Sequence, residues 1–203
     1  RQFAPGMTGA GIGHPELNLT DDILDALIAQ LTALREGAGP AVRLLLDLNF
    51  NYKPEGLRRI AKAVEPFNLL WLEMDMFEPK ALSLIRQSTT TPIGSLETIL
   101  GRRNFKPYLE SYAVDVAIID PQWNGLVESV KMAAMADAYE VNVAPHNFYG
   151  HLCTMMNAHF AAAVPNLRIM ETDIDRIAWD HELFSHAPEI VDVTTTGVAI
   201  NAN

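Results

Sequence analysis

The most constraining feature of this chain is a polar side chain that recurs at nearly constant spacing, each time at the end of an apolar segment. Successive polar ends are 23 to 26 residues apart. The six residues are Asp47, Glu73, Glu97, Asp120, His146 and Glu171. One β-strand followed by one α-helix fills such an interval, so the spacing predicts an α/β protein with a parallel sheet.

The segments between the polar ends carry the expected start and stop signals of helices. Thr20 is a good N-cap for a helix that ends near Gly37, and Pro54 and Pro79 suit the first position of two further helices. We predict strands at 43–49, 68–73, 92–97, 114–120, 141–146 and 167–171. We predict helices at 20–37, 54–64, 79–87, 104–111, 125–139 and 150–164.

Six strands that each deliver a polar side chain to the same end favour a (β/α)8 TIM-type barrel, because a doubly wound sheet concentrates its site at one switch point. A barrel usually takes about 250 residues, and this chain has 203. We therefore expect a barrel that lacks its first strands. The predicted division is a loop at 1–19, a partial barrel with strands three to eight at 20–178, and a C-terminal tail at 179–203 that could contribute to a cap.

Composition narrows the classes of partner. The chain has 15 Lys and Arg against 25 Asp and Glu, a net charge of −10, which argues against nucleic acid or an anionic membrane as the main partner. It has no apolar run long enough to cross a bilayer and no signal peptide, and its one cysteine, Cys153, fits a reducing compartment. We expect a cytoplasmic globular protein, with Cys153 as a buried small side chain.

Three carboxylates stand at successive strand ends, at Asp47, Glu73 and Glu97. Side by side at the mouth of a barrel they would repel one another and raise one another's pKa. A hard divalent cation that prefers oxygen ligands would offset this repulsion. The sequence therefore predicts a metal site, with Mg²⁺ as the first choice.

The next two strand ends carry Asp120 and His146. An aspartate on a neighbouring strand can accept a hydrogen bond from Nδ1 of the imidazole, which fixes its tautomer and raises its basicity. We therefore expect His146 to accept or donate a proton in catalysis. We also expect Trp123, Asn147 and His151, which follow these two residues in the sequence, to line the substrate pocket.

As an ordered set, these motifs resemble the barrel domain of the enolase superfamily, mandelate racemase subgroup. The motifs are Asp47-Leu-Asn49, Trp71-Leu-Glu73, Gly94-Ser-Leu-Glu97, Asp115-Val-Ala-Ile-Ile-Asp120 with Asn124-Gly125, Ala144-Pro-His146-Asn147 and Asn166-Leu-Arg-Ile-Met-Glu171. The resemblance implies that Asp47, Glu73 and Glu97 bind Mg²⁺. It also implies that Asp120 and His146 form a His-Asp dyad, that Glu171 acts near the substrate carboxylate, and that Asn49 hydrogen-bonds substrate.

The resemblance also implies segments that the printed sequence does not contain. The Lys-x-Lys strand of the family would fall just before Arg1, and the N-terminal capping domain that closes the barrel and selects substrate is absent. The sixth barrel strand carries Asp120 and no lysine, which disfavours the muconate-lactonizing subgroup.

The function that the resemblance implies is Mg²⁺-dependent abstraction of the proton next to a carboxylate, leading through an enediolate to dehydration of an acid sugar. One alternative is racemisation or epimerisation of a 2-hydroxy acid by the same first step. Another is a metal-binding barrel fragment without catalytic activity, and a weaker one is an aldolase, for which no Schiff-base lysine stands at a strand end. We expect a homo-oligomer that binds a small carboxylate substrate.

Overall fold

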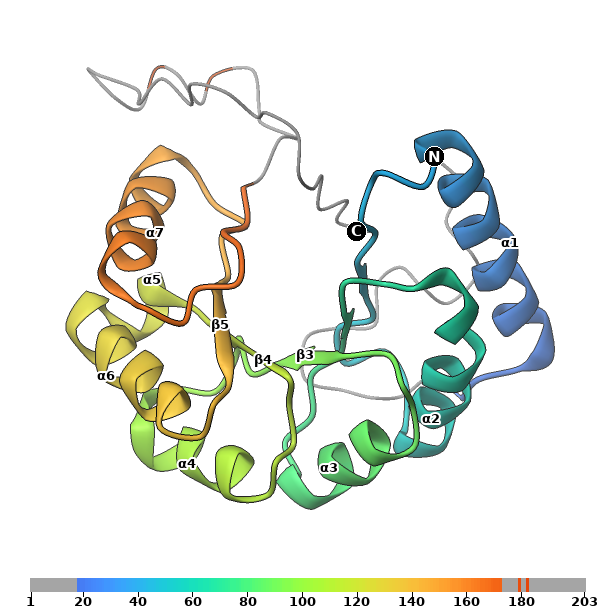
Figure 1. Ribbon diagram of the computed structural model, residues 1–203, viewed down its shortest axis with the longest axis horizontal. Helices are drawn as coiled ribbons and strands as arrows, with labels where there is room; N and C mark the ends of the chain where they lie inside the picture. Colours follow the sequence, from blue (N-terminus) through green and yellow to red (C-terminus); the bar gives the residue numbers. More distant parts are fainter. Residues whose placement is uncertain (1–17, 173–178, 180–181, 183–203) are drawn as a thin grey trace. The chain divides into compact units, whose positions relative to one another are not determined.

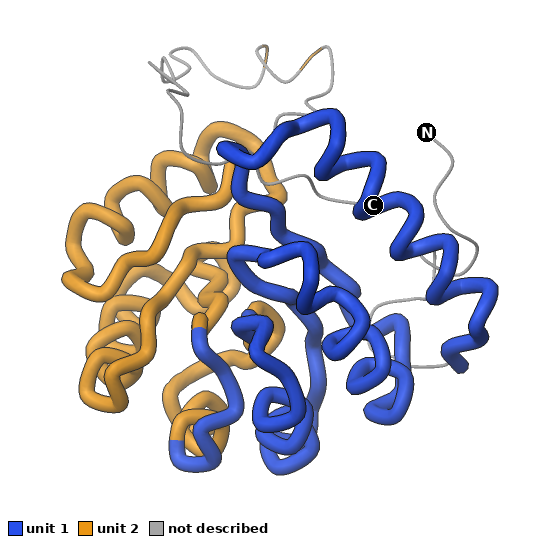
Figure 2. The backbone as a smooth tube through the Cα atoms, turned by 45° about the vertical axis from the view of Figure 1, so that its right-hand side comes forward, with its two compact units in different colours: residues 1–95, 110–115, 196–203 blue, residues 96–109, 116–195 orange. Residues whose placement is uncertain are grey.

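The structure is a computed structural model that describes residues 18–172, 179 and 182. Most of the predicted N-terminal loop and C-terminal tail therefore lies outside the described residues. Two compact units divide the chain (Figure 2). Unit 1 contains residues 1–95, 110–115 and 196–203, and unit 2 contains residues 96–109 and 116–195.

Unit 1 alternates helices with short parallel strands (Figure 1). Its elements are α1 (Asp21–Ala38), β1 (Leu46–Asp47), α2 (Pro54–Ala63), the 3-10 helix η1 (Glu65–Phe67), β2 (Leu72–Glu73), α3 (Pro79–Gln87) and β3 (Ile93–Ser95). The strands pair in parallel in the order β1, β2, β3, with Asp47 opposite Glu73 and Glu73 opposite Gly94. The carboxyl ends of β1 and β2 therefore meet at one edge.

The helices of unit 1 begin where local capping chemistry places them. The Thr20 side chain accepts a hydrogen bond from Ile23 N at 3.3 Å, and α1 is followed by Gly39 with a φ of 74°. Pro79 opens α3, and the Glu78 carboxylate accepts from Lys80 N at 3.2 Å. Because caps are sequence-local, these bounds match the predicted ones within two residues.

Unit 2 continues the alternation with α4 (Gly101–Glu110, its last residue in unit 1), β4 (Val116–Ile119), α5 (Pro121–Asn124), α6 (Leu126–Asp137), β5 (Asn142–Pro145) and α7 (His151–Ala163). Strand β4 pairs in parallel with β5, from Val116 opposite Asn142 to Ile119 opposite Pro145. Helix α6 contacts both strands, and α7 contacts β5 and α6. The predicted α/β class with parallel strands is confirmed.

Several predicted boundaries shift. The predicted helix 125–139 is α6, which begins directly after Gly125 and ends at Asp137, and the short helix α5 before it was not predicted. Helix α4 begins three residues before the predicted Asn104. The predicted strand 167–171 is represented by one parallel bridge between Leu167 and Val143. Each of the strands β1 to β5 in the described part of the chain is shorter than predicted, because the apolar run extends beyond the residues that pair.

Burial follows the apolar faces of the helices and strands. In unit 1, Leu57, Ile60, Leu82 and Ile85 are 0 to 1% exposed on α2 and α3. In unit 2, Phe105, Phe160 and Met132 are among the large core side chains, all at most 1% exposed. Within the described residues no helix is both long and apolar enough to cross a membrane.

Candidate active site

Unit 1 brings two of the predicted metal ligands together. Asp47 and Glu73 are direct neighbours in the β1–β2 register, so both side chains leave the carboxyl ends of adjacent parallel strands on the same side. Both are half-buried. Two carboxylates so placed favour a cation between them, because partial burial weakens the screening of their repulsion.

Each of these carboxylates is oriented by a nearby donor. The backbone N of Asn49 donates to Asp47 Oδ1 at 2.7 Å, and its side-chain amide donates to Asp47 Oδ2 at 3.1 Å. Trp71 Nε1 donates to Glu73 Oε2 at 2.9 Å. Such outer hydrogen bonds fix the direction of metal-binding carboxylates. In this structure Asn49, which we predict to bind substrate, hydrogen-bonds Asp47.

Gly94 makes room for the tryptophan. A Cβ atom on Gly94 would lie 2.6 Å from Cδ1 and 2.8 Å from Nε1 of Trp71, both closer than side-chain contacts allow. The absence of a side chain in β3 thus lets the indole lie against the strand with its N–H directed to Glu73. This gives the Gly94 of the recognised motif a physical role.

In unit 2 the structure assembles Glu97, Asp120 and His146. The imidazole Nδ1 lies 2.8 Å from Asp120 Oδ2, and Nε2 lies 3.3 Å from Glu97 Oε2. Asp120 is completely buried, and the side chains of Glu97 and His146 are each 13% exposed. The predicted Asp120–His146 contact is present, and the third predicted metal ligand lies on the other side of the same ring.

The pKa of His146 reflects this environment. Burial lowers it, but the hydrogen bond to Asp120 and the negative charges of Glu97, Glu171 and Asp120 raise it to about 9. In the chain without a metal ion, the imidazole is therefore protonated at neutral pH. A protonated imidazole in this position is a proton donor, and after losing its proton it is a base.

The backbone that presents Glu97 is strained. Leu96, directly before it, has a φ of 100°, a region that side chains with a Cβ atom rarely adopt. Asn49 also has a positive φ, of 50°, which asparagine tolerates more readily. A strained backbone conformation persists only where the surrounding contacts hold it in place. Such conformations are concentrated at functional sites.

Two residues near the site, Tyr149 and Asp75, make hydrogen bonds that the sequence did not predict. The hydroxyl of Tyr149 donates to Asp120 Oδ2 at 3.0 Å, which no local motif announces. In unit 1, the 5%-exposed Asp75 accepts from Ser95 Oγ at 3.2 Å, and its backbone N donates to Asn49 O at 3.0 Å. The position of Asp75 just past Glu73 makes it a candidate for supporting the site, and the structure shows that it is buried and hydrogen-bonded.

The residues predicted to line the pocket differ in exposure. Trp123 is 45% exposed, with its ring centroid 6.1 Å from that of His146. His151 is 7% exposed at the start of α7. Asn147 is completely buried, and its amide donates to Thr154 Oγ1 and to the backbone O of Glu171. These hydrogen bonds anchor the loop that carries Asn147, and its predicted contact with substrate stays a prediction.

Glu171 also serves this loop, since its Oε2 accepts from Asn147 N at 2.7 Å. Its charge is one of those that raise the pKa of His146. Its predicted role near the substrate carboxylate stays a prediction.

The three predicted metal ligands are carboxylates, the ligand type that a hard cation prefers. Asp47 and Glu73 offer adjacent carboxylate oxygens in unit 1, and Glu97 offers another in unit 2. Across residues 18–172, 179 and 182, no three His, Cys, Asp or Glu side chains are grouped so that they could hold a metal ion. The three-carboxylate site therefore stays a prediction.

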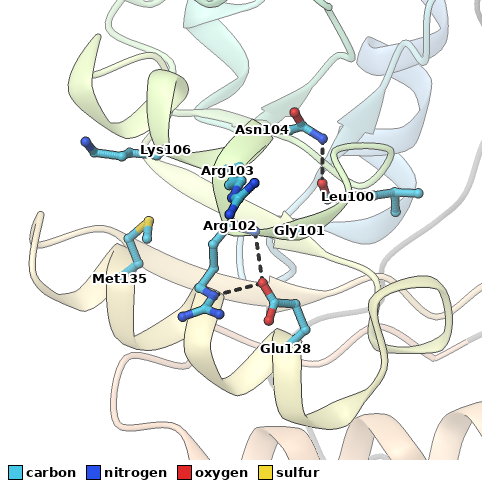
Figure 3. A pocket seen from close by; sticks show the side chains of 8 residues that line it. All are labelled: Leu100, Gly101, Arg102, Arg103, Asn104, Lys106, Glu128 and Met135. Carbon is cyan, nitrogen blue, oxygen red and sulfur yellow. Dashed lines mark hydrogen bonds and ion pairs between the residues drawn. The ribbon is translucent and has the colours of Figure 1, made fainter.

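A separate cavity of about 570 Å³ lies in unit 2 against α4 and α6 (Figure 3). Arg102, Lys106, Glu128 and Met135 are among the residues that line it, and none of the predicted site residues does. Arg102 is already paired there, because its Nε donates to Glu128 Oε1 at 2.9 Å. Glu128 thus offsets one of the positive charges that line the cavity, which also include Arg103 and Lys106.

The sequence of this chain is similar to those of known proteins. A family model described as "Enolase C-terminal domain-like" matches residues 6–197. The D-xylonate dehydratase of Haloferax volcanii is 31% identical over 170 residues, which are 82% of this chain and 41% of that protein.

Two solved structures extend the comparison. A protein from Burkholderia xenovorans strain LB400, with the provisional name L-alanine-DL-glutamate epimerase and bound to magnesium and fumarate, is 56% identical with a TM-score of 0.86. The match covers 93% of this chain and 47% of that one. A mandelate racemase/muconate lactonizing enzyme-like protein from Rubrobacter xylanophilus is 31% identical with a TM-score of 0.77, over 81% of this chain and 43% of that one. The chain thus spans a little under half the length of these relatives.

Proposed function

Because this chain belongs to the enolase superfamily, in the mandelate racemase subgroup, we propose that it abstracts the proton next to a carboxylate group and dehydrates an acid sugar. The observation that carries the proposal is the row Asp120–His146–Glu97, with contacts of 2.8 Å and 3.3 Å on the two ring nitrogens. The dehydratase relative supports the choice of acid sugars as the substrate class.

His146 has two tasks in this proposal. In its neutral form Nε2 accepts the proton from C2 of the substrate, and Asp120 stabilises the imidazolium that results. The imidazolium then donates a proton to the departing 3-hydroxyl, so C2–H and C3–OH leave together as water. The remaining enol tautomerises to a 2-keto-3-deoxy acid. A raised pKa of His146 favours the donor half of this sequence.

Asp47, Glu73 and Glu97 are the residues that would hold Mg²⁺, as sites of this superfamily pair a Lys or His base with that ion. When bound, Mg²⁺ supplies positive charge that stabilises the negative charge developing on the substrate carboxylate. Asn49 and Trp71 orient two of the ligands through their hydrogen bonds to Asp47 and Glu73.

The test is a dehydration assay on the 203-residue chain with Mg²⁺ and a panel of aldonic and aldaric acids that includes D-xylonate. Formation of 2-keto acid is measured with semicarbazide, and EDTA should abolish it. His146→Asn should lower turnover by about 10²-fold or more, the usual contribution of a general acid-base group. His159→Asn, an exposed histidine on α7, is the matched control and should leave turnover unchanged.

Two results would contradict the proposal. One is a His146→Asn protein that keeps wild-type turnover. The other is a wild-type chain that neither forms 2-keto acid nor exchanges the C2 proton for solvent deuterium with any acid of the panel.

A second candidate function is epimerisation at the carbon next to the carboxylate. It is supported by the 56% identity to the Burkholderia protein and by that protein's provisional name. Proton NMR in D₂O separates the two reactions, because epimerisation incorporates deuterium at the α-carbon and inverts it without loss of water. A dehydratase gives the keto acid in the same experiment.

A further inference from the structure

The Asp120 carboxylate is held by three donors in a completely buried position. Trp123 N donates to Oδ1 at 2.8 Å. The other oxygen, Oδ2, receives both His146 Nδ1 at 2.8 Å and the Tyr149 hydroxyl at 3.0 Å. A buried carboxylate that loses a hydrogen bond is strongly destabilised. Each donor therefore holds the Asp120 carboxylate in one position.

Tyr149 can act toward Asp120 only as a donor. Burial and the negative charge of Asp120 raise the pKa of its hydroxyl well above the ordinary value, so the phenol keeps its proton. The Tyr149 ring also meets the imidazole of His146 edge-on, with centroids 5.4 Å apart and planes at 87°. Tyr149 thus contacts Asp120 through its hydroxyl and His146 through its ring.

The loop that carries Tyr149 is itself anchored. Asn157 Nδ2 donates to the backbone O of His146 at 3.0 Å, and Asn147 N donates to Glu171 Oε2 at 2.7 Å. The Asn147 amide also donates to Thr154 on α7. Tyr149, between these anchors and the start of α7, is therefore fixed by its backbone rather than only by its own hydroxyl.

We propose that Tyr149 is a positioning residue for the Asp120–His146 pair: its hydroxyl holds Asp120 Oδ2 in line with His146 Nδ1, which turns Nε2 toward Glu97. The proposal rests on the proposed function in that His146 carries the reacting proton. It assigns Tyr149 no contact with substrate. The prediction from the sequence gave this loop residue no hydrogen-bonding role.

Tyr149→Phe tests this, since it removes one oxygen and keeps the ring. The measurement is ¹⁵N–¹H NMR of the imidazole in the metal-free 203-residue chain, with the His146 signal assigned by its loss in His146→Asn. The Nδ1–H proton should exchange with water about ten-fold faster in Tyr149→Phe, because loss of one hydrogen bond to a charged group loosens the acceptor. Tyr112→Phe, which alters a 61%-exposed tyrosine of unit 1, should match wild type.

An unchanged Nδ1–H shift and exchange rate in a Tyr149→Phe chain with wild-type circular dichroism overturns the proposal. If Tyr149→Phe destabilises the chain, 3-fluorotyrosine incorporation provides the second measurement, because the hydroxyl stays and the fluorine resonance of residue 149 must respond to Asp120→Asn. Neither readout needs turnover, so failure of the proposed reaction and failure of the positioning role give different results.

Discussion

Replacing Asp120 by Asn should lower the pKa of His146 in the metal-free chain. Burial already disfavours the imidazolium, and the hydrogen bond to Asp120 is the largest contribution that opposes it, followed by the charges of Glu97, Glu171 and Asp120. Asparagine keeps the size and one oxygen acceptor but removes the charge. The imidazolium then stays desolvated with less compensation.

The size of the effect follows from the raised pKa. The rise from 6.5 to about 9 is roughly 2.5 pH units, or about 3 kcal/mol of preference for the protonated ring. Asp120 contributes through both its hydrogen bond and its charge, so we expect Asp120→Asn to lower the pKa by at least about one unit.

The same shift makes stability depend on pH. The folded chain binds the His146 proton more tightly than the unfolded chain. This stabilisation is therefore complete below about pH 6.5 and is lost as the pH rises to about 9. Asp120→Asn should reduce that loss.

NMR titration of the His146 ring protons in EDTA measures the pKa, and urea unfolding at about pH 6 and about pH 9 measures the linked stability. Asp137→Asn, an exposed change on α6, serves as the charge control and should leave both quantities near wild type. A His146 pKa in Asp120→Asn within about 0.3 units of wild type would refute the reasoning, because Asp120 would then not be what raises it.

Three further predictions concern packing and burial. Gly94→Ala should lower the free energy of unfolding by about 1–3 kcal/mol in urea titrations, because the new Cβ overlaps the rigid indole of Trp71. Asp115→Ala should cost about 2 kcal/mol in the same assay, since it removes the partner of Arg86 Nε and Nη2, at 2.9 and 2.6 Å, at a half-exposed site. The native Cys153 thiol should react with DTNB far more slowly than the unfolded one, as burial and the charge of Asp120 raise its pKa to about 12; rapid native labelling would contradict its burial.

The sequence predicted the fold class and the family correctly. Helix starts at Thr20, Pro54 and Pro79 are specified by side chains within a turn of the helix, so they can be read without tertiary information. The barrel class is confirmed by the solved enolase-superfamily relatives. The buried position of Cys153 is confirmed as well.

Strand lengths and the short helix α5 were not predictable in the same way. A strand ends where pairing ends, and pairing depends on a neighbour some 25 residues away in the sequence. Helix α5 depends on Asp120, whose side chain accepts from Trp123 N and caps its first turn. The residue that the sequence marked for the dyad also ends a strand and begins a helix.

By itself the sequence determined which residue types stand at the strand ends, because apolar runs and their polar terminations are local patterns. Only the tertiary structure decided which distant residues they meet. It placed Gly94 of the neighbouring strand where the Trp71 indole beside Glu73 needs space, and it gave Asp120 the Tyr149 hydroxyl. The Tyr149 contact joins side chains 29 positions apart, and such a distance is set by register and loop anchoring, which no local pattern contains.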